Sequence, residues 1–317
     1  MHSLIESRRH VRRVRVRKLL AVTAVMLLIA AFGHSSSAMA TPKGIFSIFS
    51  DCPVTTPGVS ICQYAQTSSG EFSIGSTKVP INKTITLQGG GIPTGNPANE
   101  NEYFLIPATD GNSLSKTDLN VPGGLAGLIN CEEIKGTGLF EIIERGTCKA
   151  IFENKATGVT ATTELVANRH NPAILDLFSL VVEEGTALTL PVRVHLKNQL
   201  LGNSCYIGSE ASPVQLHLTT GATHPNPPNT SIRGKTGTIE SLEEKEQIVT
   251  RLKENTLVDN GFSAPVAEGC GEFFSFIIDP IVNAKLGLPS AGGHNTAILA
   301  GTLNATSASA VIASEKF

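Results

Sequence analysis

One serine and two lysines in this sequence have the spacing that serine acyl-transfer chemistry requires. Residues 113–116 (SLSK) match the pattern S-x-x-K, and residues 235–237 match K-T-G. In that chemistry Ser113 is the nucleophile, the Lys116 amine activates it, and Lys235 binds a carboxylate of the substrate. These three residues are the first catalytic candidates.

The sequence around the motifs argues against this chemistry. The two motifs follow the order found in β-lactamases and penicillin-binding proteins, but no S-D-N motif lies between them. In those enzymes the S-x-x-K opens a substantial helix, whereas Thr117–Gly124 is typical of a loop, and the helical layers of that fold are missing. A secreted serine hydrolase that uses Ser113 and Lys116 is therefore the alternative interpretation, behind a non-enzymatic protein.

Two histidines are candidate metal ligands. His195 and His217 would share one face of a sheet if their strands pair, and two imidazoles could then reach one metal ion. The neighbouring cations Arg193 and Lys197 oppose a divalent ion, and the sequence offers no third ligand. Solvated polar side chains are the simpler interpretation, so no metal and no other cofactor is expected.

Alternating side chains predict the strands that would position these candidates. In Leu188–Lys197 the apolar residues occupy every second position, the period of a strand half-buried in an antiparallel sheet. Pro191 cannot donate to a ladder, so this strand is expected at an edge or with a bulge. The same pattern recurs in Val214–Thr219. Further strands are expected at Glu71–Val79, Lys83–Gln88, Glu102–Ile106, Leu139–Ile143, Val159–Val166, Leu177–Val182, Thr296–Leu303 and Ala308–Ala313.

Helix signals are few. Residues 241–255 open with a capping box, Ser241 and Glu244, and residues 279–287 open with Asp-Pro and end with Gly. These features predict an all-β fold, mainly antiparallel and sandwich- or barrel-like, with one or two short helices. Exposed loops are expected at Gly89–Asn101 and His224–Asn229.

The first 40 residues have the three parts of a secretory signal. Residues 1–18 carry seven basic residues against the single acid Glu6, and the uncharged apolar run Leu19–Phe32 follows. The segment closes on Ala-Met-Ala, which predicts cleavage between Ala40 and Thr41. A spanning helix needs about 20 residues, so this run is too short to anchor the chain comfortably.

Loss of this segment makes the remaining chain acidic. Seven of the 25 basic and one of the 27 acidic residues lie in it, which leaves 18 against 26 and a net charge of −8. Such a charge disfavours nucleic acid and anionic membrane surfaces as partners. Residues 41–317 are expected to form a single extracytoplasmic β-rich domain, with 168–172 as the one point where it could divide.

All six cysteines follow the signal. An even number of cysteines in an exported chain indicates disulfides, and the close C-x-x-C pairs of a metal site are absent. Six cysteines allow 15 pairings, and joining sequence neighbours closes the shortest loops at the least cost in chain entropy. The favoured pairs are Cys52–Cys62, Cys131–Cys148 and Cys205–Cys270.

Four segments of the chain carry a resemblance to known sequences: Cys52-Pro53 with Cys62, Leu257–Pro265, Gly269–Gly271, and the stretch from Gly287 to Leu299. In this layout the chain resembles uncharacterised exported proteins of actinobacteria and related high-GC bacteria, over most of residues 41–317. Those proteins carry no assigned activity, so the resemblance implies export alone.

Signal, disulfides and alternating strands without a coherent catalytic set favour a non-enzymatic protein. The sequence therefore predicts a secreted or envelope-associated binding or structural module. Cell-envelope components are its candidate partners, and no stable membrane insertion is expected once the signal is removed.

Overall fold

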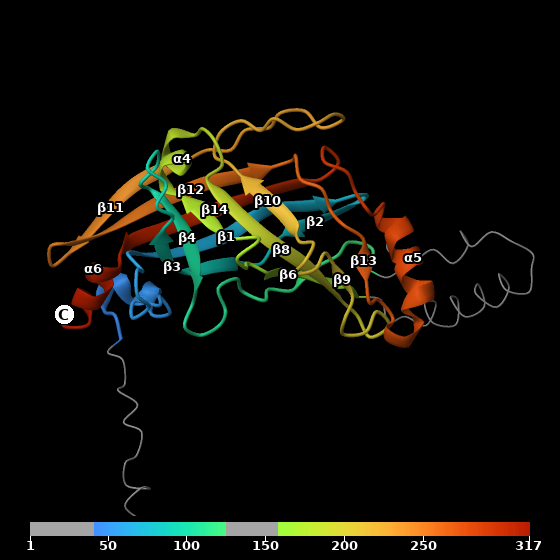
Figure 1. Cartoon of the computed structure of the whole chain (residues 1–317), viewed down its shortest axis with the longest axis horizontal. Coiled ribbons are helices and arrows are strands. Elements are labelled where there is room, and N and C mark those ends of the chain that lie inside the picture. The colour runs from blue at the N-terminus through green and yellow to red at the C-terminus, as the bar shows by residue number, and fades with distance from the viewer. Residues whose placement is uncertain (1–40, 125–157) are drawn as a thin grey trace, which may run out of the picture. The chain divides into compact units, whose positions relative to one another are not determined.

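The computed structural model describes residues 41–124 and 158–317, and strands dominate it (Figure 1). The strands are β1 (Ile61–Ile74), β2 (Thr77–Ile81), β3 (Ile85–Pro93), β4 (Glu102–Pro107), β5 (Leu119–Asn120), β6 (Thr160–Leu165), β7 (Ile174–Asp176), β8 (Leu188–Lys197), β9 (Tyr206–Ile207), β10 (Val214–Leu218), β11 (Thr238–Glu244), β12 (Gln247–Asp259), β13 (Ala267–Glu268) and β14 (Thr296–Ser307). The helices are η1 (Gly44–Phe49), α4 (Leu177–Val182), η3 (Glu272–Phe274), α5 (Ser275–Leu286) and α6 (Ala308–Ser314). Within these described ranges, none of the helices has the length and apolar character to cross a membrane.

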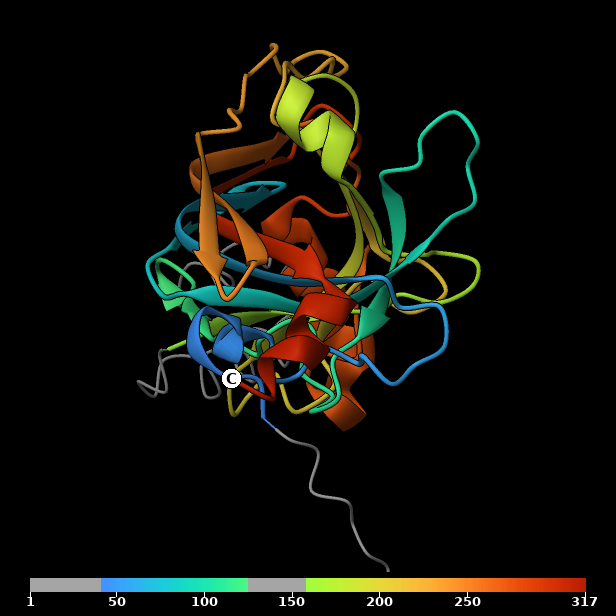
Figure 2. The same ribbon diagram turned by 90° about the vertical axis from the view of Figure 1, so that its left-hand side faces the viewer.

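The strands form one antiparallel sheet that curls around its own core. Their order is β11-β12-β14-β1-β3-β4-β7-β8-β6-β5, with β2, β9, β10 and β13 beside this path. β8 pairs with β7 and β6 along one edge and with β10 and β9 along the other. Thr219, just after β10, exchanges backbone hydrogen bonds of 2.9 and 2.8 Å with Val258 of β12. This bridge joins the part of the sheet around β8 and β10 to the part around β12 and β14 (Figure 2). The predicted all-β, mainly antiparallel fold is confirmed.

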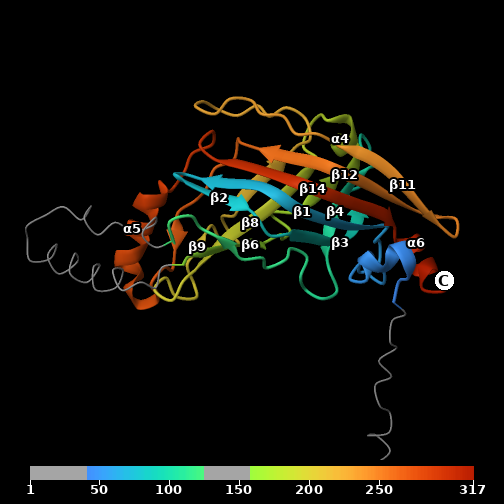
Figure 3. The ribbon, with the colours of Figure 1, turned by 180° about the vertical axis from the view of Figure 1, so that it is seen from behind.

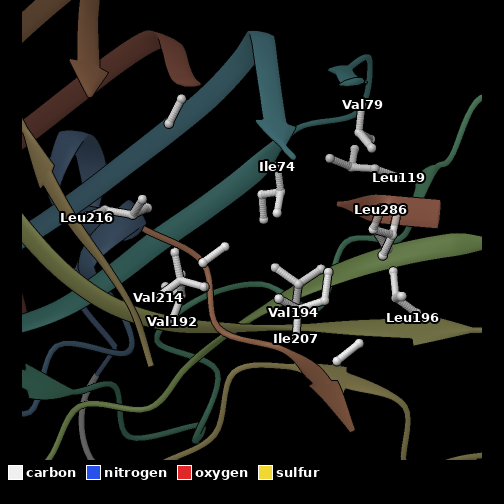
Figure 4. Packing of buried hydrophobic residues seen from close by; sticks show 14 of the residues in the cluster. Ile74, Val79, Leu119, Val192, Val194, Leu196, Ile207, Val214, Leu216 and Leu286 are labelled. Atoms are coloured by element: carbon white, nitrogen blue, oxygen red, sulfur yellow. The ribbon is translucent and has the colours of Figure 1, made fainter. Parts of the chain in front are cut away.

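The main core lies inside the curl. Every second residue of β8 from Leu188 to Leu196 is buried, as the alternation predicted, and side chains from β1, β2, β9 and β10 point toward the same interior (Figure 4). The edge position or bulge predicted from Pro191 is wrong, because β8 has partners on both sides. Pro191 lies opposite the break between β7, whose pairing ends at Thr189, and β6, whose pairing begins at Val192, so its missing N–H interrupts no ladder.

Helices cover the two ends of the sheet (Figures 1 and 3). At one end α5 buries Ile278, Val282 and Leu286 in the main core. At the other end η1 and α6 pack together, and a second cluster there buries Phe46 and Val311.

The helix predicted over residues 241–255 is wrong, because this segment forms the β11–β12 hairpin. Its two-residue turn, Lys245 and Glu246, has φ angles of 48° and 65°, the conformation that matches the twist of paired strands. Val249 packs beneath η1 and α6, whereas Leu252 faces the interior of the sheet. The strand buries opposite faces at these two points, so its apolar spacing imitates that of a helix.

Two predicted strands are helices. Residues 177–182 form α4 because the Asp176 carboxylate accepts hydrogen bonds from the N–H groups of Phe178 and Ser179, at 2.9 and 3.0 Å. Residues 308–313 belong to α6, which Ser307 caps in the same way. Both short helices thus begin at a residue whose side chain caps the first turn.

The helix predicted at residues 279–287 is present but longer. α5 begins at Ser275 and ends, as predicted, before Gly287, whose φ is 68°. Asp279 does not cap it. Its carboxylate instead accepts hydrogen bonds from the backbone N–H groups of Gly269 and Cys270, at 3.1 and 2.7 Å, and so ties α5 to the segment after β13.

The glycine run at 89–91, predicted as part of an exposed loop, is the buried middle of β3. A Cβ on Gly90 would meet the Val59 and Pro53 side chains at 2.9 and 3.0 Å. The segment that follows η1 therefore lies directly on this strand, and close backbone approach explains the glycine.

Two of the three expected disulfides fall within the described residues, and both are formed. The Cα atoms are 5.6 Å apart in Cys52–Cys62 and 4.0 Å apart in Cys205–Cys270. The expected pair Cys131–Cys148, the expected strand at 139–143 and the signal with Ala40 lie outside the described residues.

The sheet continues across residues 168–172, where the sequence allowed a division. β6 precedes this segment and β7 follows it, and both pair with the same edge of β8. Within the segment, the Asn168 carbonyl side chain accepts hydrogen bonds from the backbone N–H groups of His170 and Asn171. It is a tight turn within one sheet.

Candidate functional site

The serine and lysine of the S-x-x-K motif lie in the loop after β4, not on a helix. The Ser113 hydroxyl accepts a hydrogen bond from the backbone N–H of Ala108 at 2.9 Å. Lys116 is exposed, and no hydrogen bond joins its amine to Ser113 among the described contacts. The Ser113 hydroxyl thus holds the loop in shape.

Lys235 lies far from that loop along the sheet. It is exposed, and its backbone pairs with Thr256 of β12. The Ser113 loop meets β3 instead, through the bridge between Leu87 and Leu114. β14 and β1 lie between β12 and β3, so the three catalytic candidates are not brought together.

His195 and His217 share one face of the sheet, but they lie near opposite ends of β8. His217 pairs with Thr189 of β8, six positions before His195. Six positions of a strand span about 20 Å, too far for one metal ion. Across the described ranges, no group of three or more His, Cys, Asp or Glu residues is arranged to hold a metal.

The surroundings of His195 keep its imidazole uncharged at neutral pH. The ring stacks on Tyr206 with centroids 4.3 Å apart, and Nδ1 lies 3.6 Å from Glu164 Oε1. Burial lowers the pKa of His195 below its usual value although Glu164 opposes the change, and the cations Lys197 and Arg193 add to the lowering. This outer cluster is a packed set of polar and aromatic side chains.

His217 borders a polar cleft of about 470 Å³. Glu183, on its rim, binds Arg233 at 2.7 Å and accepts a hydrogen bond from the Thr236 N–H at 2.9 Å. The Thr236 hydrogen bond, followed by the Arg233 contact, lowers the pKa of Glu183 below its usual range. The His217 backbone N–H donates to Asp259 at 2.7 Å. Glu183 and Asp259, two of the acidic residues that line the cleft, are thus already engaged with groups of the protein.

A different site lies inside the curled sheet, where no residue was singled out from the sequence. It is a cavity of about 80 Å³. A cavity needs roughly 10–15 Å³ to hold one water molecule, so this cavity has room for several non-hydrogen atoms. Its walls come from both flanks of the sheet and from α4, and they are mostly leucine: Leu87, Leu105, Leu114, Leu119, Leu175, Leu180, Leu188, Leu190, Leu216, Leu257, Leu299 and Leu303.

A smaller apolar cavity of about 40 Å³ lies toward the α5 end. Phe72, Leu119 and Thr163 border both cavities and form the partition between them. The Phe72 ring is held on its other side by Phe262, with centroids 5.8 Å apart. The interior thus holds two apolar cavities separated by these three side chains.

Gln63 of β1 is the exceptional residue in the wall of the larger cavity. Its side chain is buried, with 2% of the residue exposed, and in the described structure neither Nε2 nor Oε1 has a hydrogen-bond partner. Most buried side-chain amides are partnered, because each unpartnered group costs about 1–3 kcal/mol. Two unpartnered groups on one side chain at the wall of a cavity make Gln63 the candidate ligand contact.

Sequence reasoning missed Gln63 because the first half of β1 has no clean apolar alternation. The inward-facing positions are Ile61, Gln63, Ala65 and Thr67, which mix polar and apolar residues. A strand was expected only from Glu71 onward. Gln63 lies before that point, so the sequence did not predict that its side chain faces the interior of a sheet.

No protein-family profile, no curated protein and no solved structure matches this chain. The candidate site therefore rests on its own geometry.

Proposed function

We propose that this is an extracytoplasmic, disulfide-stabilised binding protein that holds a small apolar molecule inside its curled sheet. The observation that carries the proposal is the leucine-lined cavity with the unpartnered Gln63 amide in its wall. Ligand pockets in proteins are mostly apolar with a few placed polar groups, and this cavity has that composition. The dispersed positions of Ser113, Lys116 and Lys235 favour binding over catalysis.

Export of the protein is part of the proposal. The basic head, the short apolar run and the Ala-Met-Ala ending support a cleaved signal, and buried disulfides support an oxidising destination. When the full chain is expressed in a secreting bacterial host, we expect the exported protein to begin at Thr41. N-terminal sequencing checks this, and an exported chain that still begins at Met1 would contradict a cleaved signal.

Xenon tests the cavity as a binding site, because it enters apolar cavities without any hydrogen-bonding group. We expect xenon pressure to shift the NMR signals of methyl groups that line the cavity, such as those of Leu190, Leu257 and Leu303. Ala65→Leu should weaken these shifts at least about tenfold, because three added carbon atoms occupy the space beside Leu303.

Ala300→Leu is the matched control, since Ala300 lies on the same pair of strands but is not among the residues that line the cavity. This variant should keep the wild-type xenon response. The proposed function fails if wild-type cavity methyl groups do not respond to xenon, or if Ala65→Leu responds as strongly as the wild type.

A further inference from the structure

The position of Gln63 explains why its amide has no partner in the protein. On one side β1 pairs Gln63 with Gly89 of β3, and on the other side with Ala305 of β14. Glycine and alanine carry no hydrogen-bonding side chain, and the cavity wall in front of Gln63 is leucine-rich. Neither of the residues paired with Gln63 can therefore satisfy its amide.

Among the residues that the structure describes, the wall of the cavity carries no charge. None of the residues that line it is Asp, Glu, Lys, Arg or His, and its polar members are amides and threonines. The other buried amide, Asn255, donates to the Leu252 carbonyl at 3.5 Å. Only Gln63 presents both an amide donor and an amide acceptor without a partner among the described residues.

On the basis of the proposed binding function, we propose that Gln63 selects the chemical class of the ligand. The ligand is a small, uncharged, apolar molecule with one group that both donates and accepts a hydrogen bond, as an alcohol or a primary amide does. Such a group accepts from Gln63 Nε2 and donates to Oε1, so it satisfies both atoms at once.

Other ligand classes satisfy the site less well. An ether, ester or ketone accepts from Nε2 but leaves Oε1 without a donor. An ionised carboxylate would lose its hydration in a wall that offers no cation, and burying an unpaired charge is far more costly than burying a neutral polar group. A pure hydrocarbon leaves both atoms of the Gln63 amide unpartnered.

Two isomers of equal size test the proposal. 1-Butanol and 1-methoxypropane each have five non-hydrogen atoms, but only the alcohol can donate. In NMR titrations of the purified protein, followed on the cavity methyl groups, we expect the alcohol to bind about tenfold more tightly than the ether. Butyrate at neutral pH should cause no saturable shift.

Gln63→Met removes the amide while keeping a side chain of similar length. This variant should bind the two isomers with equal affinity, still respond to xenon, and melt at a higher temperature than the wild type, because two unpartnered groups are gone. Equal affinities in the wild type, or an alcohol preference that survives in Gln63→Met, would overturn the role of Gln63. A normal xenon response in the same samples would leave the proposed function standing.

Discussion

Replacing Asn295 with alanine will lower the free energy of unfolding by about 3 kcal/mol, because one buried and two partly buried backbone groups lose their partner together. Asn295 is fully buried between β14 and the loop after α5. Its Oδ1 accepts from the Gly75 N–H at 2.9 Å, and its Nδ2 donates to the carbonyls of Phe262 and Ala291 at 2.8 and 3.2 Å. One amide therefore holds the β1–β2 turn and two loops together.

Urea unfolding of the wild type and the variant measures this loss. Asn112→Ala is the matched control, because Asn112 is exposed and water replaces the hydrogen bonds that its amide makes with Asp110. We expect the control to change stability by less than about 0.5 kcal/mol. A loss of under 1 kcal/mol for Asn295→Ala would mean that water reaches the freed groups.

The strands that could be predicted from the sequence are those with one buried face. β8 alternates strictly along its length, and both its position and its buried side follow from that pattern. β12 could not be read in this way because it buries Val249 on one face and Leu252 on the other. Val249 is buried because η1 and α6 cover that face of β12, and these two helices come from opposite ends of the described chain. The local sequence of β12 therefore does not reveal which face is buried there.

The candidate site was less predictable than the fold. A glutamine in a strand normally faces solvent, and nothing in its local sequence marks Gln63 as an exception. Its isolation arises from Gly89 and Ala305, which only the sheet register places beside it. The S-x-x-K and K-T-G motifs had clear spacing, but the segments that carry them lie beside different strands. The K-T-G segment pairs with β12 and the S-x-x-K loop with β3, and β14 and β1 lie between those two strands.

Replacing Cys205 and Cys270 together with alanine is expected to lower the free energy of unfolding by about 4 kcal/mol, the larger of the two disulfide effects. This disulfide spans 65 positions, whereas Cys52–Cys62 spans 10. Because the entropy of loop closure grows with loop length, we expect removal of Cys52–Cys62 to lower the free energy of unfolding by only about 3 kcal/mol. Urea unfolding of the two double-alanine variants measures both losses. An equal loss, or the reverse order, would contradict the dependence on loop length.

The Cys205–Cys270 disulfide should also hold one end of the sheet locally. Cys205 immediately precedes β9, and β9 pairs with β13 at only two positions, Tyr206 with Glu268 and Ile207 with Ala267. So short a ladder has little stability of its own, and the segment after β13 carries the N–H groups that Asp279 of α5 binds. Without the disulfide, we expect faster amide hydrogen exchange in α5 and β13 under native conditions, while β1 and β14 keep their protection. Uniformly faster exchange would show instead that the disulfide acts only on the unfolded chain.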